Sequence, residues 1–485
     1  MKEFNLIENL PYILFVIYVV CLLIQLFSTI EKRESNTIKK FAVGTQKYSV
    51  IVLLITILGT MIGPGFSYGA IEEFYQYGFG YTLCFLLVGL QFWLFSKFFA
   101  GKMHEISKEN GSIVTLGGIV GLKYNKPAQF ASGLLSLAFA IGLVAVLSYA
   151  GGKVLSDFLG IQKELATFIV IMFIAVYTFS GGIATIVRTD KINVCLILMF
   201  LLIGIGCGIY VFVSKDANLF STIWEWGYTN TTKVKTPNAG WLNIAIAFLL
   251  GEIFIPVYSV RSMMTDDKKK TQEAFRWAAI IGVIWFIALT FIAIATHLLP
   301  ESEKLSYLNL IDTVLSSNSF WAVLCKSIAI IGMIGVVVST LDSILNAAGV
   351  SFSKDIVEIA EPIYKKIFKK KETENKSNEK KYHRYVILFI TFIGFVCAIY
   401  ANGIVSALLY TYSIWVPAIF CPIVYCLVSK NIKNKWTGLI GMIAGFCGWF
   451  AFSKIDAVWN FPMVYGIIIS AIATFISERY KTSNN

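Results

Sequence analysis

The chain has 485 residues, of which 57% are hydrophobic and only 14% are charged. Soluble globular proteins average about 25% charged residues, so this composition excludes a soluble protein and predicts an all-α membrane protein. The formal net charge of +12 does not indicate a nucleic-acid partner, because no soluble domain is left once the apolar segments are set aside.

Apolar runs recur along nearly the whole chain, and their lengths match the thickness of a bilayer. We expect a single transmembrane domain over residues 1–485 with about thirteen membrane-spanning helices. In chain order they lie near residues 10–30, 48–74, 79–100, 128–150, 165–180, 191–213, 241–260, 275–298, 320–350, 385–402, 405–428, 436–453 and 459–477.

The basic residues predict the orientation of these helices. Most of the 41 Lys and Arg residues fall in alternate loops, at residues 31–47, 101–127, 181–190, 261–275, 351–384 and 429–435. The positive-inside rule places such loops in the cytoplasm. We therefore expect a multi-pass protein of the cell (inner) membrane with its N-terminus outside and its C-terminus in the cytoplasm.

Two of the expected helices are interrupted by residues that weaken a helix. "GTMIGPGFSYG" (residues 59–69) holds four glycines and Pro64, and "LLGEIFIPVYS" (residues 249–259) holds Glu252 and Pro256. In hydrocarbon the freed backbone groups need partners, so broken helices occur where they line a cavity or bind something. Such a pair predicts an inverted-repeat transporter with a midplane binding site, and two unrelated proline kinks are the alternative.

Carboxylates and hydroxyls stand in two further apolar stretches. "YTFSGGIATIVRTDKIN" (residues 177–193) contains Asp190, and "GVVVSTLDSILNAAGVSFSKDI" (residues 335–356) contains Ser339, Thr340, Asp342 and Ser343. A carboxylate inside the membrane is costly, and hard oxygen ligands suit a small hard cation. The alternatives are hydroxyls that bond to their own helix and, for Asp190, a carboxylate that stabilises a helix start.

These stretches resemble motifs of the sodium:solute symporter family, which includes proline, galactose, sialic acid and glucose symporters. The matching segments are "ILGTMIGPGFSYG", "FSGGIATIVRTDKIN" and "VVVSTLDSILNAAGVSFSKDI". "GSIVTLGGIVGLKYNKP" resembles the family's Thr-Leu…Arg-Phe-Gly loop, with glycine where glutamate is usual. The resemblance implies a LeuT-type core of two inverted five-helix repeats, near residues 48–213 and 241–428, with one helix before and two after.

The resemblance also implies sodium ligands. The first sodium site would use the carbonyls of Gly59, Ile62 and Val336 and the hydroxyls of Ser339 and Thr340. Some members bind a second sodium ion, and the corresponding residues here are Asp190, Ser339 and Ser343, with Asp342 where one such member has a serine.

A solute site is expected between the two breaks. Counting back from Arg261, which resembles an arginine of the family, Glu252 falls where other members place a substrate-contacting side chain. A buried carboxylate without a fixed cation favours a solute with an amine or quaternary ammonium group. The alternative is that Glu252 satisfies backbone N–H groups of its own broken helix. The other expected contacts are Met61, Phe66, Ser67, Tyr410 and Ser413.

Together these features predict a sodium-coupled symporter that imports a small polar solute by alternating access. A proton-coupled permease of the same fold, with Asp190, Glu252 or Asp342 as the proton carrier, is one alternative, and a membrane sensor or channel is another. The hydroxyl pair argues against a proton, which needs no cage of oxygen atoms. We find no nucleophile–base pattern and expect no enzyme; the expected partners are the solute, sodium and the lipid bilayer, without an obligate protein partner.

Overall fold

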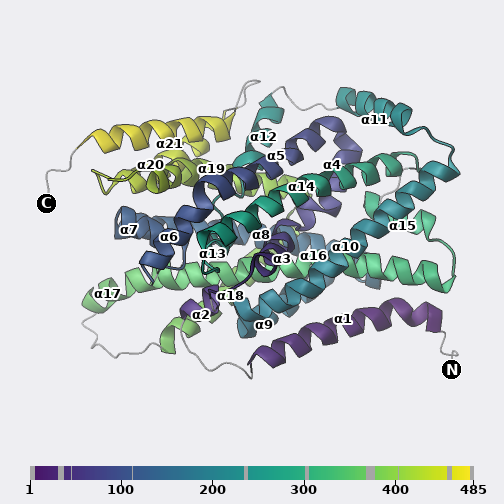
Figure 1. Cartoon of the computed structure of the whole chain (residues 1–485), viewed down its shortest axis with the longest axis horizontal. Helices are drawn as coiled ribbons and strands as arrows, with labels where there is room; N and C mark the ends of the chain where they lie inside the picture. The colour runs from purple at the N-terminus through teal and green to yellow at the C-terminus, as the bar shows by residue number, and fades with distance from the viewer. Residues whose placement is uncertain are drawn as a thin grey trace.

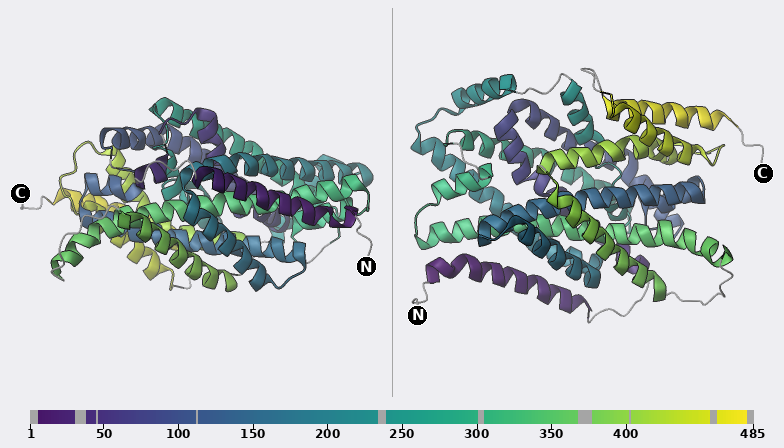
Figure 2. Two further views of the ribbon diagram at one scale, coloured as in Figure 1. Left: turned by 90° about the horizontal axis from the view of Figure 1, so that it is seen from below. Right: turned by 180° about the vertical axis from the view of Figure 1, so that it is seen from behind.

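The computed structural model describes residues 6–30, 38–44, 46–111, 113–233, 239–300, 305–367, 377–401, 403–455 and 461–480. Helices account for all regular structure in these residues, and most of them run along the longest dimension of the molecule (Figure 1). The N-terminal helix lies along one flank, and the last two helices lie along the opposite flank (Figure 2). An all-α protein is therefore confirmed.

Each of the thirteen expected segments coincides with one helix or with a broken pair. In chain order they are α1 (Leu6–Ile30), α3 (Val50–Met61) with α4 (Tyr68–Tyr77), α5 (Phe79–Phe95), α8 (Lys126–Leu159), α9 (Lys163–Gly181), α10 (Ile183–Ser214), α12 (Ala239–Leu250) with α13 (Pro256–Arg261), α14 (Lys268–His297), α16 (Phe320–Ser351), α18 (Ser377–Ile399), α19 (Ile404–Val428), α20 (Thr437–Phe452) and α21 (Pro462–Arg479).

Shorter elements connect these helices, and the hydropathy pattern did not predict them. They are α2 (Ile38–Val43), α6 (Gly101–Glu109), α7 (Leu116–Lys123), α11 (Leu219–Lys233), α15 (Ser306–Val314), α17 (Glu358–Ile367), the 3₁₀ turn η1 (Pro64–Phe66) and the π turns η2 (Ser96–Ala100) and η3 (Phe352–Val357).

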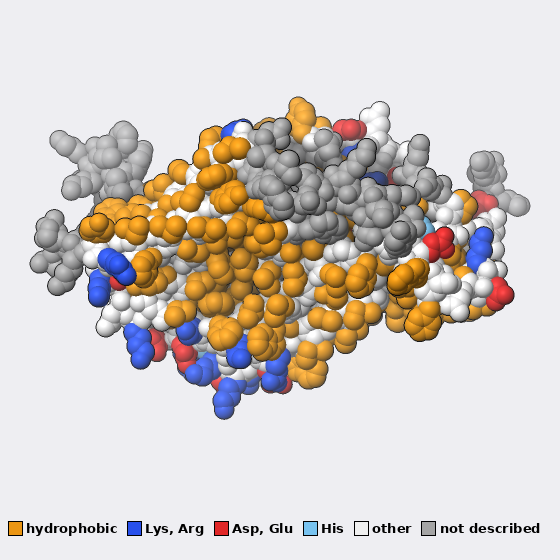
Figure 3. All heavy atoms as spheres, turned by 90° about the horizontal axis from the view of Figure 1, so that it is seen from above, with side chains coloured by type: hydrophobic (Ala, Val, Ile, Leu, Met, Phe, Trp, Pro, Cys, Tyr) orange, Lys and Arg blue, Asp and Glu red, His pale blue; other side chains and the backbone are white. Residues whose placement is uncertain are grey.

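Seven helical stretches of the described chain are long and apolar enough to cross a membrane on their own. The full number of thirteen crossings remains a prediction. Hydrophobic side chains cover most of the middle of the face in Figure 3, and charged side chains gather toward its ends and lower edge. Such a surface is typical of a protein surrounded by lipid.

Helix α16 lies at the centre of the molecule. It packs against α8 and α10, and α1 packs against its outer side. The first broken helix packs against α14 and α10, so its middle lies inside the helix bundle (Figure 1). This arrangement places both breaks next to the polar stretch of α16.

The first break has a clear local cause. Pro64 has no backbone N–H to donate, and the N–H of Gly63 donates to Met61 O at 2.9 Å rather than to the carbonyl four residues back. Helix α3 therefore ends at Met61, and the single turn η1 precedes α4. The carbonyl of Gly59 consequently loses its usual donor within the helix.

The second break is stabilised by a neighbouring helix. Helix α12 ends at Leu250, and α13 begins at Pro256, a favoured residue for the first helical position. The backbone N–H of Glu252 donates to Oε1 of Gln91 on α5 at 3.1 Å. Both expected interruptions are thus confirmed, and a side chain supplies one of the lost hydrogen bonds.

The start of α10 differs from the expectation. The sequence places a loop over residues 181–190, but the structure reduces it to Gly182, and α10 begins at Ile183. Asp190 is therefore the eighth residue of this helix. Arg188, Asp190 and Lys191 lower the local hydropathy and made the segment resemble a loop, although neighbouring helices pack against it and keep it helical.

Gly182 is a position where only glycine fits. Its φ of 84° lies in a region that other residues rarely adopt, and a Cβ atom there would lie 2.7 Å from Cε2 of Phe41. We expect Gly182→Ala to destabilise the folded protein by about 1–3 kcal/mol. The melting temperature of the purified protein in detergent measures this effect.

Gly206 on α10 supplies the matched control, because an added Cβ atom there meets no atom within 4 Å. Gly206→Ala should leave the melting temperature unchanged or raise it. Equal melting temperatures for Gly182→Ala and the wild type would contradict the assignment of strain.

The "GSIVTLGG" stretch anchors one end of α16. The hydroxyl of Thr115 accepts the N–H of Gly118 at 2.9 Å and donates to Oδ1 of Asp355 at 2.7 Å. Gln129 on α8 donates to the same oxygen at 3.1 Å, and Ser351 donates to Oδ2 at 2.7 Å. The Asp355 carboxylate thus joins α7, α8 and α16 through hydrogen bonds.

Candidate functional site

The carbonyl of Gly59 and the hydroxyl pair of α16 meet at the first break. Ser339 Oγ lies 2.7 Å from Gly59 O, and Thr340 Oγ1 lies 3.2 Å from the same atom. Both hydroxyls also lie within 3.3 Å of Val336 O on their own helix. Four of the five expected sodium ligands therefore form one compact group of oxygen atoms.

Ile62, the fifth expected ligand, is the residue directly after α3. It is buried, and its N–H donates to Leu58 O at 2.8 Å. The next residue, Gly63, lies against the hydroxyl pair, since an added Cβ atom would lie 3.3 Å from Thr340 Oγ1. The structure thus places Ile62 at the break beside the group.

Alternative bonding of the hydroxyls to their own helix accounts for only part of the geometry. Ser339 is closer to Gly59 O on α3 than to Val336 O on α16. A hydroxyl that bonds only to its own helix would not approach a freed carbonyl of another helix. The pair therefore connects the first broken helix to α16.

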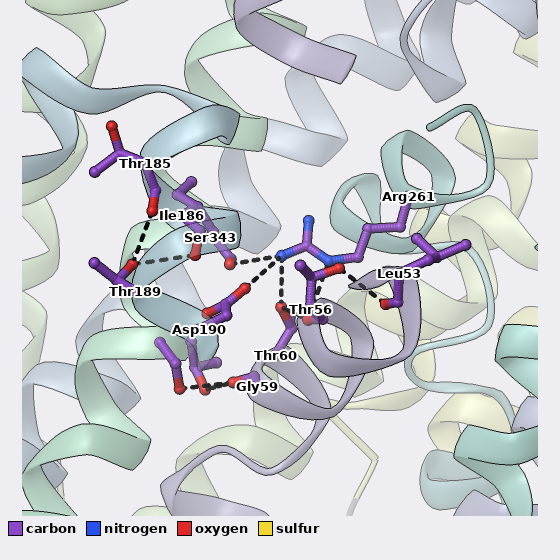
Figure 4. Close-up of polar contacts among 12 residues, drawn as sticks. Leu53, Thr56, Gly59, Thr60, Thr185, Ile186, Thr189, Asp190, Arg261 and Ser343 are labelled. Carbon is purple, nitrogen blue, oxygen red and sulfur yellow. Dashed lines mark hydrogen bonds and ion pairs between the residues drawn. The ribbon is translucent and has the colours of Figure 1, made fainter. Parts of the chain in front are cut away.

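A buried arginine stands beside this group. Arg261, the last residue of α13, donates through Nη2 to Thr60 Oγ1 at 2.9 Å and to Ser343 Oγ at 2.8 Å (Figure 4). Its Nε donates to Thr56 O at 3.2 Å. Nη2 also lies 3.9 Å from Asp190 Oδ2. Arg261 therefore contacts α3, α10 and α16 at once.

Two buried carboxylates, Asp190 on α10 and Asp342 on α16, belong to helices that the arginine contacts. The side chains of Asp190 and Asp342 have no solvent exposure, and none of their oxygen atoms has a hydrogen-bond partner in the described structure. Asp190 also approaches the first break, since a Cβ atom on Gly59 would lie 3.1 Å from its Oδ1. The expected residues of a second cation site are thus close neighbours of the first group.

The alternative reading of Asp190 as a helix-start carboxylate is wrong. The residue lies two turns inside α10 and pairs with Arg261. Arg188 instead donates to Ser28 Oγ at 3.0 Å. A helix dipole acts mainly within the first turn, so it does not explain a carboxylate at this depth.

Glu252 is held by two tyrosines at the second break. Tyr412 donates to Oε1 at 2.6 Å, and Tyr258 donates to Oε2 at 3.0 Å. Gly251 makes room for this arrangement, because an added Cβ atom would lie 2.6 Å from the Tyr412 ring. The alternative was that Glu252 binds N–H groups of its own helix. Among the described residues, its side chain instead accepts hydrogen bonds from the two tyrosine hydroxyls.

A small cavity of about 30 Å³ lies between the two breaks. Met61, Phe66 and Glu252 line it, as expected, together with Thr60 and Thr340 beside the sodium ligands. The remaining lining is glycine or aliphatic, so Glu252 is the one charged residue among the lining residues of the described chain. The cavity has room for about one water molecule and is too small for a solute.

The structure does not bring the other three expected solute contacts to this cavity. Ser67 is buried, and its hydroxyl donates to Gly63 O at 2.9 Å within the broken helix. Tyr410 is 64% exposed, and together with Ser413 it lines a separate groove beside α12, α20 and α21. Successive helical residues are rotated by about 100°, so Tyr412 rather than Tyr410 faces Glu252.

Sequence reasoning missed Tyr412, Tyr258 and Gln91. Each contacts Glu252 from a different element, namely α19, α13 and α5. The six-residue spacing between Glu252 and Tyr258 across a break gave no periodic signal. Of these three residues, only Gln91 was indicated by the sequence, because it is a polar residue in an apolar helix.

A second, larger cavity of about 320 Å³ lies between α4, α8 and the beginnings of α15 and α19. We call it the vestibule. Ile404 on α19 lines the vestibule, whereas Leu408 lines the small cavity. Gly65 and Gly69 face these two side chains at close range. One helical turn of α19 thus separates the two cavities.

Residues 41–445 match the model of the sodium:solute symporter family, and the chain belongs to this family. The sodium/pantothenate symporter of Haemophilus influenzae is 23% identical over 499 residues, which cover 98% of this chain and 97% of that protein. The sodium/sialic acid symporter SiaT of Proteus mirabilis is 24% identical over 176 residues, which cover 34% of this chain and 35% of that protein.

The fold is confirmed by a solved structure. A Na⁺-coupled sialic acid symporter in a substrate-bound outward-open state aligns with a TM-score of 0.77 at 16% identity, covering 96% of this chain and 97% of that one. The chain therefore has the LeuT-type fold. It is a sodium-coupled solute symporter, and sodium and a small solute are its transported partners.

Proposed function

We propose that this protein imports a small polar solute together with sodium, which binds between the first broken helix and α16. The observation that carries the proposal is the approach of Ser339 Oγ and Thr340 Oγ1 to the freed carbonyl of Gly59. Carbonyl and hydroxyl oxygens are the ligands that a hard cation prefers. A sodium ion among them replaces hydrogen bonds between helices with ion–oxygen contacts.

Such a site couples the ion to the conformation of the protein. Its ligands come from α3 and α16, so a bound ion holds the broken helix against α16 only in conformations that keep both parts together. One inward sodium ion gains about 2.3 kcal/mol per 100 mV of membrane potential, in addition to its concentration gradient. We propose the predicted orientation in the inner membrane, with the N-terminus outside, for this inward transport.

A proton-coupled cycle is the weaker alternative. Asp190 and Asp342 could carry a proton, but neither explains why two hydroxyls and a freed carbonyl converge at 2.7–3.2 Å. Initial uptake rates into proteoliposomes distinguish the two cycles. A sodium gradient at equal pH should drive accumulation, and a proton gradient without sodium should not.

The solute class that we propose is a small molecule with an amine or ammonium group. Support comes from Glu252, the charged residue of the cavity lining, whose partners are two neutral hydroxyls and not a cation. Phe66 on the same wall offers an aromatic face for a cation–π contact. The names of the related symporters, pantothenate and sialic acid, designate other solutes, so the solute requires a direct test.

We expect Glu252→Gln to abolish discrimination in favour of cationic solutes. The substitution keeps the side-chain shape but removes the charge, so inhibition of uptake by cationic competitors should weaken about tenfold or more. Competition is measured with neutral, cationic and anionic solute panels in both proteins. Gln91→Leu is the control, since it removes the hydrogen bond to the Glu252 backbone without changing the charge. If cationic solutes never compete, or the ranking is unchanged in Glu252→Gln, the amine class is wrong.

A further inference from the structure

A cavity of about 530 Å³ lies beside the N-terminal helix. We call it the flank cavity. Its walls come from the first turns of α1, the last turns of α8, helix α15 and the first turns of α16. The beginning of α1 and α15 lie at the same end of the molecule (Figure 1). None of the expected sodium ligands or solute contacts is among the described residues that line it. Its volume is in the range of small-molecule sites.

The buried part of the lining is mostly apolar. Val154 on α8, Leu308 on α15 and Ile330 on α16 line the flank cavity and are at most 9% exposed. The rings of Tyr12 on α1 and Phe158 on α8 form a further wall, with their centroids 5.6 Å apart. A hydrocarbon group in this part of the cavity would be removed from water, which is favourable.

Charged side chains stand in the accessible part of the lining. Glu8 on α1 and Asp157 on α8 are exposed, and Lys326 on α16 pairs with Asp312 at 2.7 Å. Three carboxylates and one ammonium group give the lining an excess of negative charge. A carboxylate has two oxygen atoms with several acceptor sites, so it can bind a ligand ammonium group in addition to a donor of the protein. The flank cavity therefore suits a molecule with a cationic head and an apolar body.

The lipid bilayer can supply such a molecule. Tyr12, which lines the flank cavity, and Val16 and Ile17 after it are about half exposed. Apolar residues exposed on a membrane-spanning helix face lipid. Trp321 at the beginning of α16 is 72% exposed, and exposed tryptophans are typical of the membrane–water interface. The cavity thus lies near the depth of the lipid headgroups.

We propose that the flank cavity binds a phospholipid whose headgroup carries a primary ammonium group, as in phosphatidylethanolamine. The ammonium group binds Glu8 and Asp157, because its three N–H donors can reach carboxylates of two helices at once. The phosphate lies near Lys326, whose ammonium group has donors beyond the one that Asp312 accepts. The beginning of an acyl chain packs against Ile330. The bound lipid joins α1 to α8 and α16.

Native mass spectrometry of the purified full-length protein tests the proposal by counting bound lipids. The protein in detergent is titrated separately with phosphatidylethanolamine, phosphatidylcholine and phosphatidylglycerol that carry the same acyl chains. The wild type should bind one phosphatidylethanolamine at least about tenfold more tightly than phosphatidylglycerol, which has no cation. Phosphatidylcholine, whose quaternary ammonium group cannot donate a hydrogen bond, should bind less tightly than phosphatidylethanolamine. The measurement needs neither sodium nor solute, so its result is independent of the proposed function.

The double variant Glu8→Gln/Asp157→Asn should lose the preference for phosphatidylethanolamine over phosphatidylglycerol. Both side chains are exposed, and the substitutions keep their size. Glu164→Gln is the matched control, because Glu164 is an exposed carboxylate near the beginning of α9 and is not among the lining residues. It should keep the wild-type preference.

Equal affinity of the wild type for phosphatidylethanolamine and phosphatidylglycerol, or an unchanged preference in the well-folded double variant, overturns the proposal. Full competition by glycerophosphoethanolamine, which has the headgroup without acyl chains, would identify a soluble amine as the occupant and also overturns it. If the double variant does not fold, Ile330→Phe decides the matter. This substitution fills the apolar part of the cavity without changing its charge, so phosphatidylethanolamine affinity should fall about tenfold. Unchanged affinity in Ile330→Phe places the lipid elsewhere.

Discussion

Replacing Ser339 and Thr340 together by alanine should lower the apparent sodium affinity at least about tenfold, or roughly 1.4 kcal/mol. The double variant removes both hydroxyl ligands and leaves only carbonyls around the ion. It also removes the contacts at 2.7 and 3.2 Å that join α16 to Gly59 O. Sodium activation of uptake and ²²Na⁺ binding both measure the change.

Ser327→Ala is the matched control for this prediction. Ser327 is a buried serine of the same helix, but its hydroxyl donates to Val323 O of its own helix at 2.6 Å. Its loss should leave sodium affinity near the wild-type value. Thr340→Ser, which keeps the hydroxyl, should retain most of the affinity. Wild-type sodium activation in the double alanine variant would contradict the assignment of Ser339 and Thr340 as sodium ligands.

Asp190→Asn should weaken sodium binding by about tenfold or more even if Asp190 never touches the ion. The substitution keeps the size of the side chain and removes one negative charge next to Gly59. The sodium ion then loses the attraction of a buried carboxylate that lies beside its carbonyl ligand Gly59. The affinity is measured by ²²Na⁺ binding, and the melting temperature reports whether the fold is intact.

Asp312→Asn provides the comparison for the loss of a carboxylate. Asp312 pairs with Lys326 at 2.7 Å away from the sodium ligands, and the loss of this partly exposed pair should have little effect on sodium. An Asp190→Asn protein with wild-type affinity and normal folding would show that the Asp190 charge does not act on the ion.

The sequence was sufficient for the breaks because their causes are local. Pro64 and Pro256 lack a backbone donor wherever they stand, and a broken helix in a membrane implies something bound at the break. The helical spacing of Ser339 and Thr340 likewise placed them on neighbouring faces of one helix. Their distance to Gly59 O, by contrast, depends on how α3 and α16 pack.

The remaining errors concern helix rotation and burial, which are tertiary properties. Residues 410–413 of α19 are all polar or aromatic, and nothing in their order specifies whether Tyr410 or Tyr412 faces the second break. The hydroxyl of Ser67 is satisfied within the turn that the break creates. The helix around Asp190 resembled a loop because it carries charged residues, and Arg261, which pairs with Asp190, lies far away in the sequence.

The single turn of α19 between the small cavity and the vestibule sets the energy scale of opening. The barrier consists mainly of Leu408 and Ile404 seated against Gly65 and Gly69. Exposing two such aliphatic side chains to water costs about 3–6 kcal/mol. Reversing a two-state equilibrium from 1:99 to 99:1 requires about 5.5 kcal/mol of differential binding. The free energy of exposing Leu408 and Ile404 is therefore similar to the preference that a bound ion or solute can have for one conformation. Binding can thus connect or separate the small cavity and the vestibule, and they stay separate when neither ligand is bound.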